Sequence, residues 1–232
     1  TNKLTAGAFV GDGSELTGLP ASGFDPNVDT IKIGNGAGTT TQGDSAIAIG
    51  HDAGSSGTQG GFSVAVGKSA GQATQGAFAV ALGNAAGSNN QAAEAVAIGD
   101  IAGQSNQGSS AVAVGYYAGR NSQGSKSVAV GFRAGMNNQE SNGVAIGNSA
   151  GSNSQANEAV AIGYHAGLNS QGTQAVAIGD ICALNNQAQA CTSVGRMSGQ
   201  NGQQYYSVAV GVASASQNQG TTDVAVGHGS GY

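Results

Sequence analysis

The sequence predicts an all-β fold, a parallel β-roll or β-solenoid of about thirteen coils of sixteen residues. The first observation is a short motif, Val-Ala-Ile/Val-Gly or a close variant, whose glycines lie sixteen residues apart in eleven of twelve spacings and seventeen apart in the other. The second is a glutamine eight residues before each of these glycines from Gly50 onward. The third is the composition, with 42 glycines in 232 residues and only 8% charged residues, against about 25% in an ordinary domain. A period of this length is typical of solenoid repeats.

The N-terminal segment, residues 1–29, differs from the rest of the chain. It lacks the repeat and contains both prolines, Pro20 and Pro26. We expect it to be a connector or cap, followed by a β-roll domain over residues 30–232 whose first coil begins at Thr30.

Each coil is expected to contain two short strands and two turns, because sixteen residues are too few for a strand and a helix. In one unit, Val96-Ala97-Ile98 is a β-branched run that ends at Gly99, and turn residues follow it. Equivalent residues of successive coils should stack about 4.8 Å apart, so thirteen coils would form a rod of roughly 60 Å.

The strand of each coil is apolar on both faces. Val112 and Val114 point to one side of the strand, while Ala111 and Ala113 point to the other. A strand of this kind is normally buried on both faces, and a single thin coil covers only one of them. The pattern therefore predicts association with other chains, with alanine allowing close approach. It leaves open which face lies at the axis of the assembly.

The glutamine column is interpreted as a structural ladder of stacked amides that bond to one another along the axis. The alternative is a polar row that faces a ligand. We favour the ladder because every coil has a glutamine, whereas a binding site rarely needs twelve. Its central members are Gln91, Gln107, Gln123, Gln139, Gln155 and Gln171.

The two positions after each strand glycine vary most, and recognition belongs where a scaffold is free to vary. In the middle coils they hold aromatic and basic residues that could stack on sugar rings and hydrogen-bond to hydroxyls. The alternative is that these side chains cover the coil edge or contact a neighbouring chain. The candidate ligand-binding residues are Tyr116, Tyr117, Arg120, Phe132, Arg133, Tyr164 and His165, with Lys126 as a further candidate.

A second aromatic group is predicted at the other turn of the coil, where we expect it to serve packing. It consists of Phe62, Phe78, Tyr205 and Tyr206. Cys182 and Cys191 replace small residues within one coil and are expected to be buried free thiols; the alternative is a disulfide between coils.

The remaining residues do not have the types and spacing that catalysis requires, and we expect no enzyme, no cofactor and no metal. His51, His165 and His228 fall in widely separated coils, and no metal-ligand spacing is present. A net charge of −5 with seven scattered basic residues argues against a nucleic acid partner. No stretch of about 18 apolar residues occurs, so we expect no membrane insertion by this segment.

The motif Ser-Val-Ala-Val-Gly-x-x-Ala, at 63–70 and 127–134, resembles the head repeat of YadA-type trimeric autotransporter adhesins. The resemblance covers about residues 30–232. It implies a left-handed parallel β-roll, a homotrimer, and display on the bacterial surface to bind host matrix or cells. The coils of that family are typically shorter, and the Asn-x-Gln-Gly half of the present repeat departs from its usual Ala-x-Gly half.

Residues 4–20 are similar to connector segments of trimeric phage and viral fibre proteins, which favours a viral attachment fibre. We therefore expect an extracellular, cell-surface or virion-surface adhesion module that binds a host glycan or matrix protein. The alternatives are the head of a bacterial trimeric adhesin, a structural spacer within a fibre, and an ice-binding solenoid.

Overall fold

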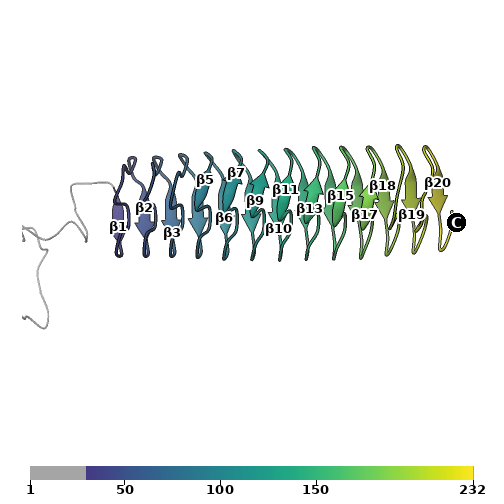
Figure 1. Ribbon diagram of the computed structural model, residues 1–232, viewed down its shortest axis with the longest axis horizontal. Helices are drawn as coiled ribbons and strands as arrows, with labels where there is room; N and C mark the ends of the chain where they lie inside the picture. Colours follow the sequence, from purple (N-terminus) through teal and green to yellow (C-terminus); the bar gives the residue numbers. More distant parts are fainter. Residues whose placement is uncertain (1–29, 232) are drawn as a thin grey trace, which may run out of the picture.

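A computed structural model describes residues 30–231 of the chain, and the connector predicted for residues 1–29 lies outside these residues. Residues 30–231 form a parallel β-solenoid of about twelve turns, which extends as a straight rod (Figure 1). The predicted all-β fold and the sixteen-residue repeat are confirmed. Within the described range there is no helix, and hence none that could span a membrane.

Sheet A has one strand from each repeat, thirteen in all, so about twelve full turns lie between its first strand and its last, and all its strands pair in parallel with a shift of one repeat. Its thirteen strands are β1 (Ile31–Ile33), β2 (Ile47–Ile49), β3 (Val64–Val66), β4 (Val80–Leu82), β6 (Val96–Ile98), β8 (Val112–Val114), β10 (Val128–Val130), β12 (Val144–Ile146), β14 (Val160–Ile162), β16 (Val176–Ile178), β18 (Thr192–Val194), β19 (Val208–Val210) and β20 (Val224–Val226).

Sheet B lies on the other side of the coil and is shorter. Its seven strands are β5 (Asn89–Gln91), β7 (Ser105–Gln107), β9 (Asn121–Gln123), β11 (Asn137–Gln139), β13 (Asn153–Gln155), β15 (Asn169–Gln171) and β17 (Asn185–Gln187).

The strands of sheet B pair through fewer residues than those of sheet A, because their middle residue adopts a left-handed backbone. Asn138, in the middle of β11, has φ 51°, and only the residues on either side of it pair with β13. Outside the seven strands the same sheet continues as isolated bridges such as Gln42↔Gln59. The one seventeen-residue spacing is absorbed on this side, between Gly54 and Gln59.

Two glycine columns shape the turn that follows each sheet A strand. Gly99 has φ +127°, and a Cβ there would lie 2.8 Å from the carbonyl oxygen of Gly115 in the next coil. Gly103 has φ +51°, and its Cβ would lie 2.6 Å from Oε1 of Gln107. Both columns therefore need glycine for close approach as well as for backbone conformation.

The interior of the coil is filled by alanine. Ala97 in β6, Ala102 in the following turn and Ala111 before β8 have no exposed surface. The valines and isoleucines on the opposite face of sheet A point outward and remain half-buried or exposed. This corrects the expectation that alanine would allow another chain to approach. Alanine packs within one chain, and the Val/Ile face is the apolar surface left on the outside.

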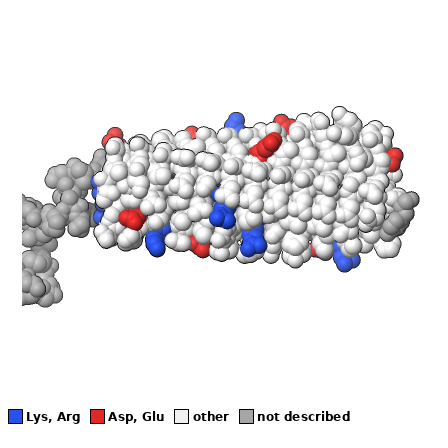
Figure 2. All heavy atoms as spheres, in the orientation of Figure 1, with Lys and Arg blue, Asp and Glu red and all other residues white. Residues whose placement is uncertain are grey.

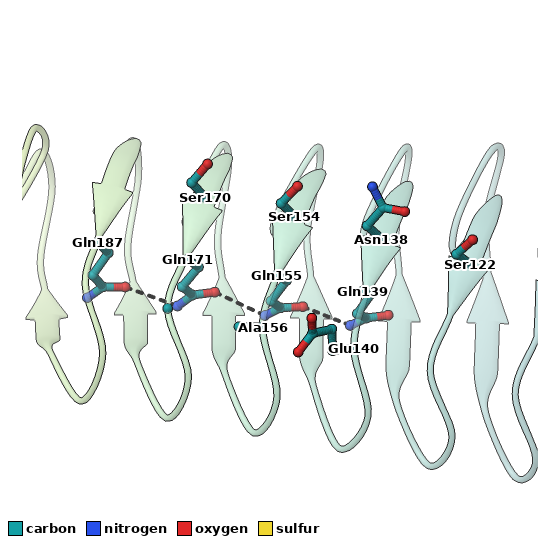
Figure 3. A pocket seen from close by; sticks show the side chains of 11 residues that line it. Ser122, Asn138, Gln139, Glu140, Ser154, Gln155, Ala156, Ser170, Gln171 and Gln187 are labelled. Atoms are coloured by element: carbon teal, nitrogen blue, oxygen red, sulfur yellow. Dashed lines mark hydrogen bonds between the residues drawn. The ribbon is translucent and has the colours of Figure 1, made fainter.

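The glutamine column crosses this interior as a continuous ladder (Figure 3). The side-chain nitrogen Nε2 of Gln139 donates to Oε1 of Gln155 at 2.9 Å and to the carbonyl oxygen of Val128 in sheet A at 3.0 Å. The pattern repeats from Gln59 to Gln203. Each buried amide thus joins successive coils along the axis and also joins sheet B to sheet A.

Candidate functional site

The two turns of each coil lie at opposite edges of the rod. We call the edge that follows sheet A, represented by residues 99–104, the first-turn edge. The edge that precedes sheet A, represented by residues 108–111, is the second-turn edge. Equivalent side chains stack along each edge because successive coils pair in register.

Most of the predicted ligand-binding residues meet in one cluster on the first-turn edge. The rings of Tyr116 and Phe132, from adjacent coils, are stacked with centroids 5.6 Å apart and planes 15° apart. Both rings are exposed, Tyr116 by 41% and Phe132 by 43%. Tyr117 meets the Tyr116 ring edge-on with centroids 4.2 Å apart. A hydrogen bond with the Tyr117 side chain raises the pKa of the Tyr116 phenol above its ordinary value.

Two guanidinium groups complete this aromatic–arginine cluster. The Cζ atom of Arg120 lies 4.8 Å from the centroid of the Tyr117 ring. The Cζ atom of Arg133 lies 5.0 Å from the centroid of the Phe132 ring. Both distances are within the range of a cation–π contact, so the aromatic faces help to position the two cations.

Tyr164 and His165 form a separate pair on the same edge. Their rings are stacked with centroids 3.9 Å apart, and the Tyr164 ring is 49% exposed. The coil that carries Asn148 and Ser149 separates this pair from Phe132. Two coil spacings make that distance roughly 10 Å along the axis. The structure therefore divides the predicted column into two groups.

Lys126 does not belong to either group. It lies on the second-turn edge, with φ 59° and its backbone nitrogen donating to the carbonyl oxygen of Ser109. Its assignment to the ligand-binding column was wrong because its distance from the strand glycine places it in the turn that precedes the strand.

The second aromatic group is more exposed than a packing role within the chain predicts. Phe62 and Phe78 stack at 5.1 Å with nearly parallel planes, yet each is more than half exposed. Tyr205 and Tyr206 are 50% and 58% exposed. All four lie on the second-turn edge, where a single chain offers nothing to cover them.

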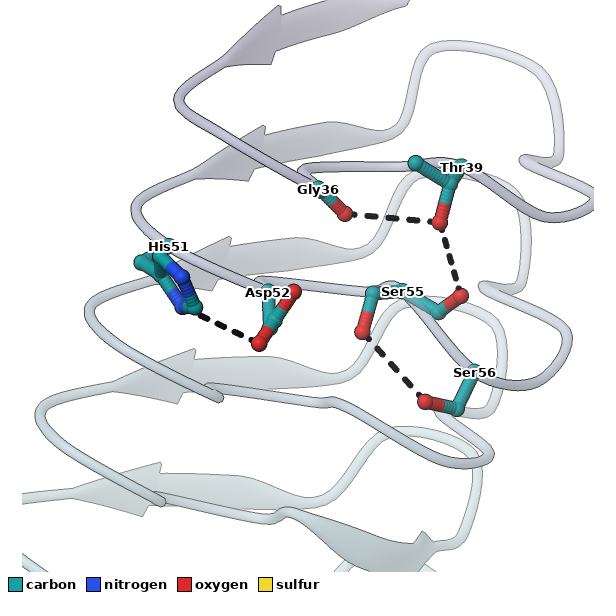
Figure 4. Close-up of polar contacts among 6 residues, drawn as sticks. All are labelled: Gly36, Thr39, His51, Asp52, Ser55 and Ser56. Atoms are coloured by element: carbon teal, nitrogen blue, oxygen red, sulfur yellow. Dashed lines mark hydrogen bonds and ion pairs between the residues drawn. The ribbon is translucent and has the colours of Figure 1, made fainter.

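The other titratable groups form small, separate contacts. In the second coil, Nδ1 of His51 lies 3.0 Å from Oδ2 of Asp52, beside hydroxyl and carbonyl contacts of Thr39 and Ser55 (Figure 4). Among residues 30–231, no three or more His, Cys, Asp or Glu side chains gather as a metal site would require.

Both cysteines are buried and free. Burial raises the pKa of the Cys182 thiol to about 12, so this residue stays protonated and unreactive at neutral pH. Cys191 donates its thiol hydrogen to the carbonyl oxygen of Gln204.

A polar groove of about 640 Å³ follows the outer side of sheet B (Figure 3). Its lining includes a column of exposed hydroxyl and amide side chains, Ser122, Asn138, Ser154 and Ser170, together with Glu140. Beside it runs a second amide ladder that sequence reasoning missed, although the repeated Asn-x-Gln pattern contained the signal. Its members are Asn121, Asn137, Asn153, Asn169, Asn185 and Asn201.

Comparison with known proteins gives no match to a family model, to a curated protein or to a solved structure.

Proposed function

We propose that the protein is the adhesion module of a trimeric surface fibre that attaches to a host cell surface, more specifically a viral attachment fibre. The observation that carries this proposal is the aromatic–arginine cluster on the first-turn edge. Two exposed rings, those of Tyr116 and Phe132, lie together with the Tyr117 ring and two arginine cations in adjacent coils of this edge. Rings of this kind stack on sugars, while the cations bond to hydroxyl or acidic groups. The proposed role involves no catalysis and no cofactor.

The trimer of this proposal is a left-handed β-roll with the Val/Ile face of sheet A at its axis. Support comes from the length of that face, which carries two large apolar side chains in nearly every coil. Contiguous apolar surface of this extent is rare on monomeric proteins. Three parallel chains would present three equal first-turn edges, so weak single sites would act together through multivalency. Such a fibre would lie on a virion or cell surface.

The test is binding of the purified chain to an array of host-surface glycans and matrix proteins. The variant Tyr117→Ala/Phe132→Ala/Tyr164→Ala should lose binding because each ring supplies stacking surface. The matched control Phe62→Ala/Phe78→Ala/Tyr205→Ala removes three exposed rings from the opposite edge and should retain it. Unchanged binding by the first triple variant would refute the assignment of the binding site to the first-turn edge.

A second candidate function is a structural spacer, favoured by the continuous glutamine ladder, which makes the rod stiff along its length. A spacer would bind neither cells nor glycans in the assay above, yet would retain the same rod-like shape in small-angle scattering. The head of a bacterial trimeric adhesin would share the geometry and differ only in the surface that displays it.

A further inference from the structure

We propose that the first-turn edge at Arg120 and Arg133 binds an acidic, linear glycan that runs along the rod. This inference rests on the proposed function and specifies the ligand class. Carboxylated or sulfated sugars would bond to the two guanidinium groups, while their ring faces lie on the exposed aromatic residues beside them.

The first observation is the distribution of charge between the two edges. The first-turn edge has four of the basic residues and all three histidines, whereas the second-turn edge has five carboxylates and a single lysine. Figure 2 shows several basic side chains along one long edge of the rod. The basic residues of the first-turn edge are Lys68, Arg120, Arg133 and Arg196. The carboxylates of the second-turn edge are Asp44, Glu94, Glu140, Glu158 and Asp223. The rod is therefore electrically asymmetric although the whole chain is acidic.

The second observation is that the arginines of the cluster have no carboxylate partner among the described residues. Each of the three aspartates on this edge is already engaged. Asp52 pairs with His51, Asp180 pairs with Nε of Arg196 at 3.4 Å, and Asp100 accepts a hydrogen bond from Asn84 at 2.7 Å. Within residues 30–231, the one ion pair of an arginine or lysine is that of Arg196 with Asp180, and Asp52 contacts the His51 imidazole.

The third observation is that both guanidinium groups are held in place without being neutralised. Arg120 lies against Tyr117 and donates from Nε to Oε1 of Gln104 at 3.2 Å, which leaves the terminal nitrogens free. Arg133 lies against Phe132. An arginine that is oriented in advance loses less conformational freedom when it bonds to an anion, and its planar fork matches a carboxylate or sulfate.

The geometry favours a linear polymer over a compact ligand. One coil lies between the stacked pair Tyr116–Phe132 and the pair Tyr164–His165, so Phe132 and Tyr164 are two coil spacings apart, roughly 10 Å along the axis. A single sugar is too small to contact both pairs, whereas an extended oligosaccharide can place one ring on each. The intervening Asn148 is exposed and would face the sugar between them with its amide, whereas Ser149 is buried and donates its hydroxyl hydrogen to Oδ1 of Asn148.

A nucleic acid fits these residues less well. Binding to a phosphate backbone requires many neutralising contacts, and the cluster offers two unpaired arginines on a chain of net charge −5. The outer face of sheet A is apolar and the second-turn edge is acidic, so neither would extend such a contact.

The test measures binding of the whole chain to immobilised heparin, to polygalacturonate and to the neutral polymer dextran, at low and at high salt. We expect both acidic glycans to bind at low salt and to dissociate at high salt. Arg120→Gln/Arg133→Gln should weaken this binding by roughly tenfold or more, because charge-assisted hydrogen bonds are lost. The controls are Lys126→Gln on the opposite edge and Arg196→Gln, whose side chain is already paired, and both should bind like the unmodified chain.

The possible outcomes separate this inference from the proposed function. Equal loss in the Lys126→Gln control would overturn it, because binding would then follow net charge. Equal binding of polyphosphate or duplex DNA would also overturn it, because the sugar would contribute nothing. Binding of dextran but not of acidic glycans, with loss in the aromatic triple variant, would overturn it and leave the proposed adhesion function standing. If neither acidic glycan binds, this inference fails, whereas the proposed adhesion function fails only if the array of host-surface glycans and matrix proteins also gives no binding.

Discussion

At the scale of single residues, the repeat places non-glycine side chains in left-handed backbone with unusual frequency. One such column is the second residue after each strand glycine, which includes Tyr117, Arg133 and His165 with φ between 52° and 58°. Asparagine, aspartate and histidine tolerate this conformation far better than β-branched residues do. Ile101 and Ile181, with φ of 60° and 55°, are therefore the most strained members of the column.

Replacing Ile101 with asparagine should stabilise the protein. The left-handed conformation costs a bulky L-residue about 1–2 kcal/mol, and Ile101 is only half-buried, so little packing is lost. We expect the free energy of unfolding to rise by about 1 kcal/mol, a shift of roughly 2–4 °C in Tm, measured by thermal unfolding followed by circular dichroism.

The matched control is Ile98→Asn in β6 of the same coil. It makes the same chemical change in extended backbone, where asparagine is disfavoured, and it should lower Tm. A lower Tm for both variants would show that side-chain packing, and not backbone strain, governs position 101.

At the scale of structural elements, the glutamine ladder takes the place of a large hydrophobic core. Two layers of alanine bury little apolar surface, so the amides that span the interior supply the cohesion between sheets. From Gln59 to Gln203, each Nε2 has a partner in sheet A and another in the next coil. Buried amides of this kind are costly only when a partner is missing.

Gln139→Leu, in a central coil of the rod, should therefore lower the free energy of unfolding. It leaves the Oε1 acceptor of Gln155 without its donor and removes the acceptor of Gln123. Each buried polar group without a partner costs about 1–3 kcal/mol. Chemical denaturation should measure the lower free energy of unfolding. Amide hydrogen exchange, measured separately, should be faster in the neighbouring coils.

Gln42→Leu is the control for that measurement. Gln42 is the first glutamine of the ladder, its Oε1 has no partner among the described residues, and its Nε2 donates to Gln59 alone. The variant should lose less stability than Gln139→Leu. Equal losses would mean that amide bonding within the ladder contributes little.

At the scale of the whole molecule, the rod has two dissimilar broad faces. The outer side of sheet A is lined by Val/Ile pairs, and the outer side of sheet B by asparagine and serine. An apolar face of this length, with an alanine core behind it, predicts burial against copies of the same chain.

Light scattering should therefore give a mass of three chains, and Val128→Lys/Val144→Lys/Val160→Lys should reduce it to one. These valines lie in β10, β12 and β14 and face outward, so the variant should keep its β-sheet circular dichroism. Ser122→Lys/Ser154→Lys/Ser170→Lys adds the same charges to the opposite face and should keep the trimeric mass. A single-chain mass for the unmodified protein would contradict the assembly.

Much of the fold could be predicted from sequence because the interactions recur at a fixed spacing. The strand glycines set the length of the coil, and the glutamine that recurs in every repeat from Gln42 onward indicates a ladder. The asparagine ladder was missed because Asn121 and its equivalents are followed by variable residues, and asparagine is also common in turns. The site was predicted only in part, because the spacing places Tyr116, Phe132 and Tyr164 in one column but does not show which side chains of that column contact one another.

The sequence by itself determined the period, the parallel stacking and the positions free to vary, because each depends on residues that repeat along the chain. Only the tertiary structure decided which face of the strand is inside. Val112 and Ala113 are both apolar, and the choice depends on the width of the coil. The glutamine amide must reach from sheet B to a carbonyl of sheet A, as Gln123 reaches Val112, and this short span leaves room for alanine and none for valine. The larger side chains therefore lie outside, on the face that we propose lies at the trimer axis.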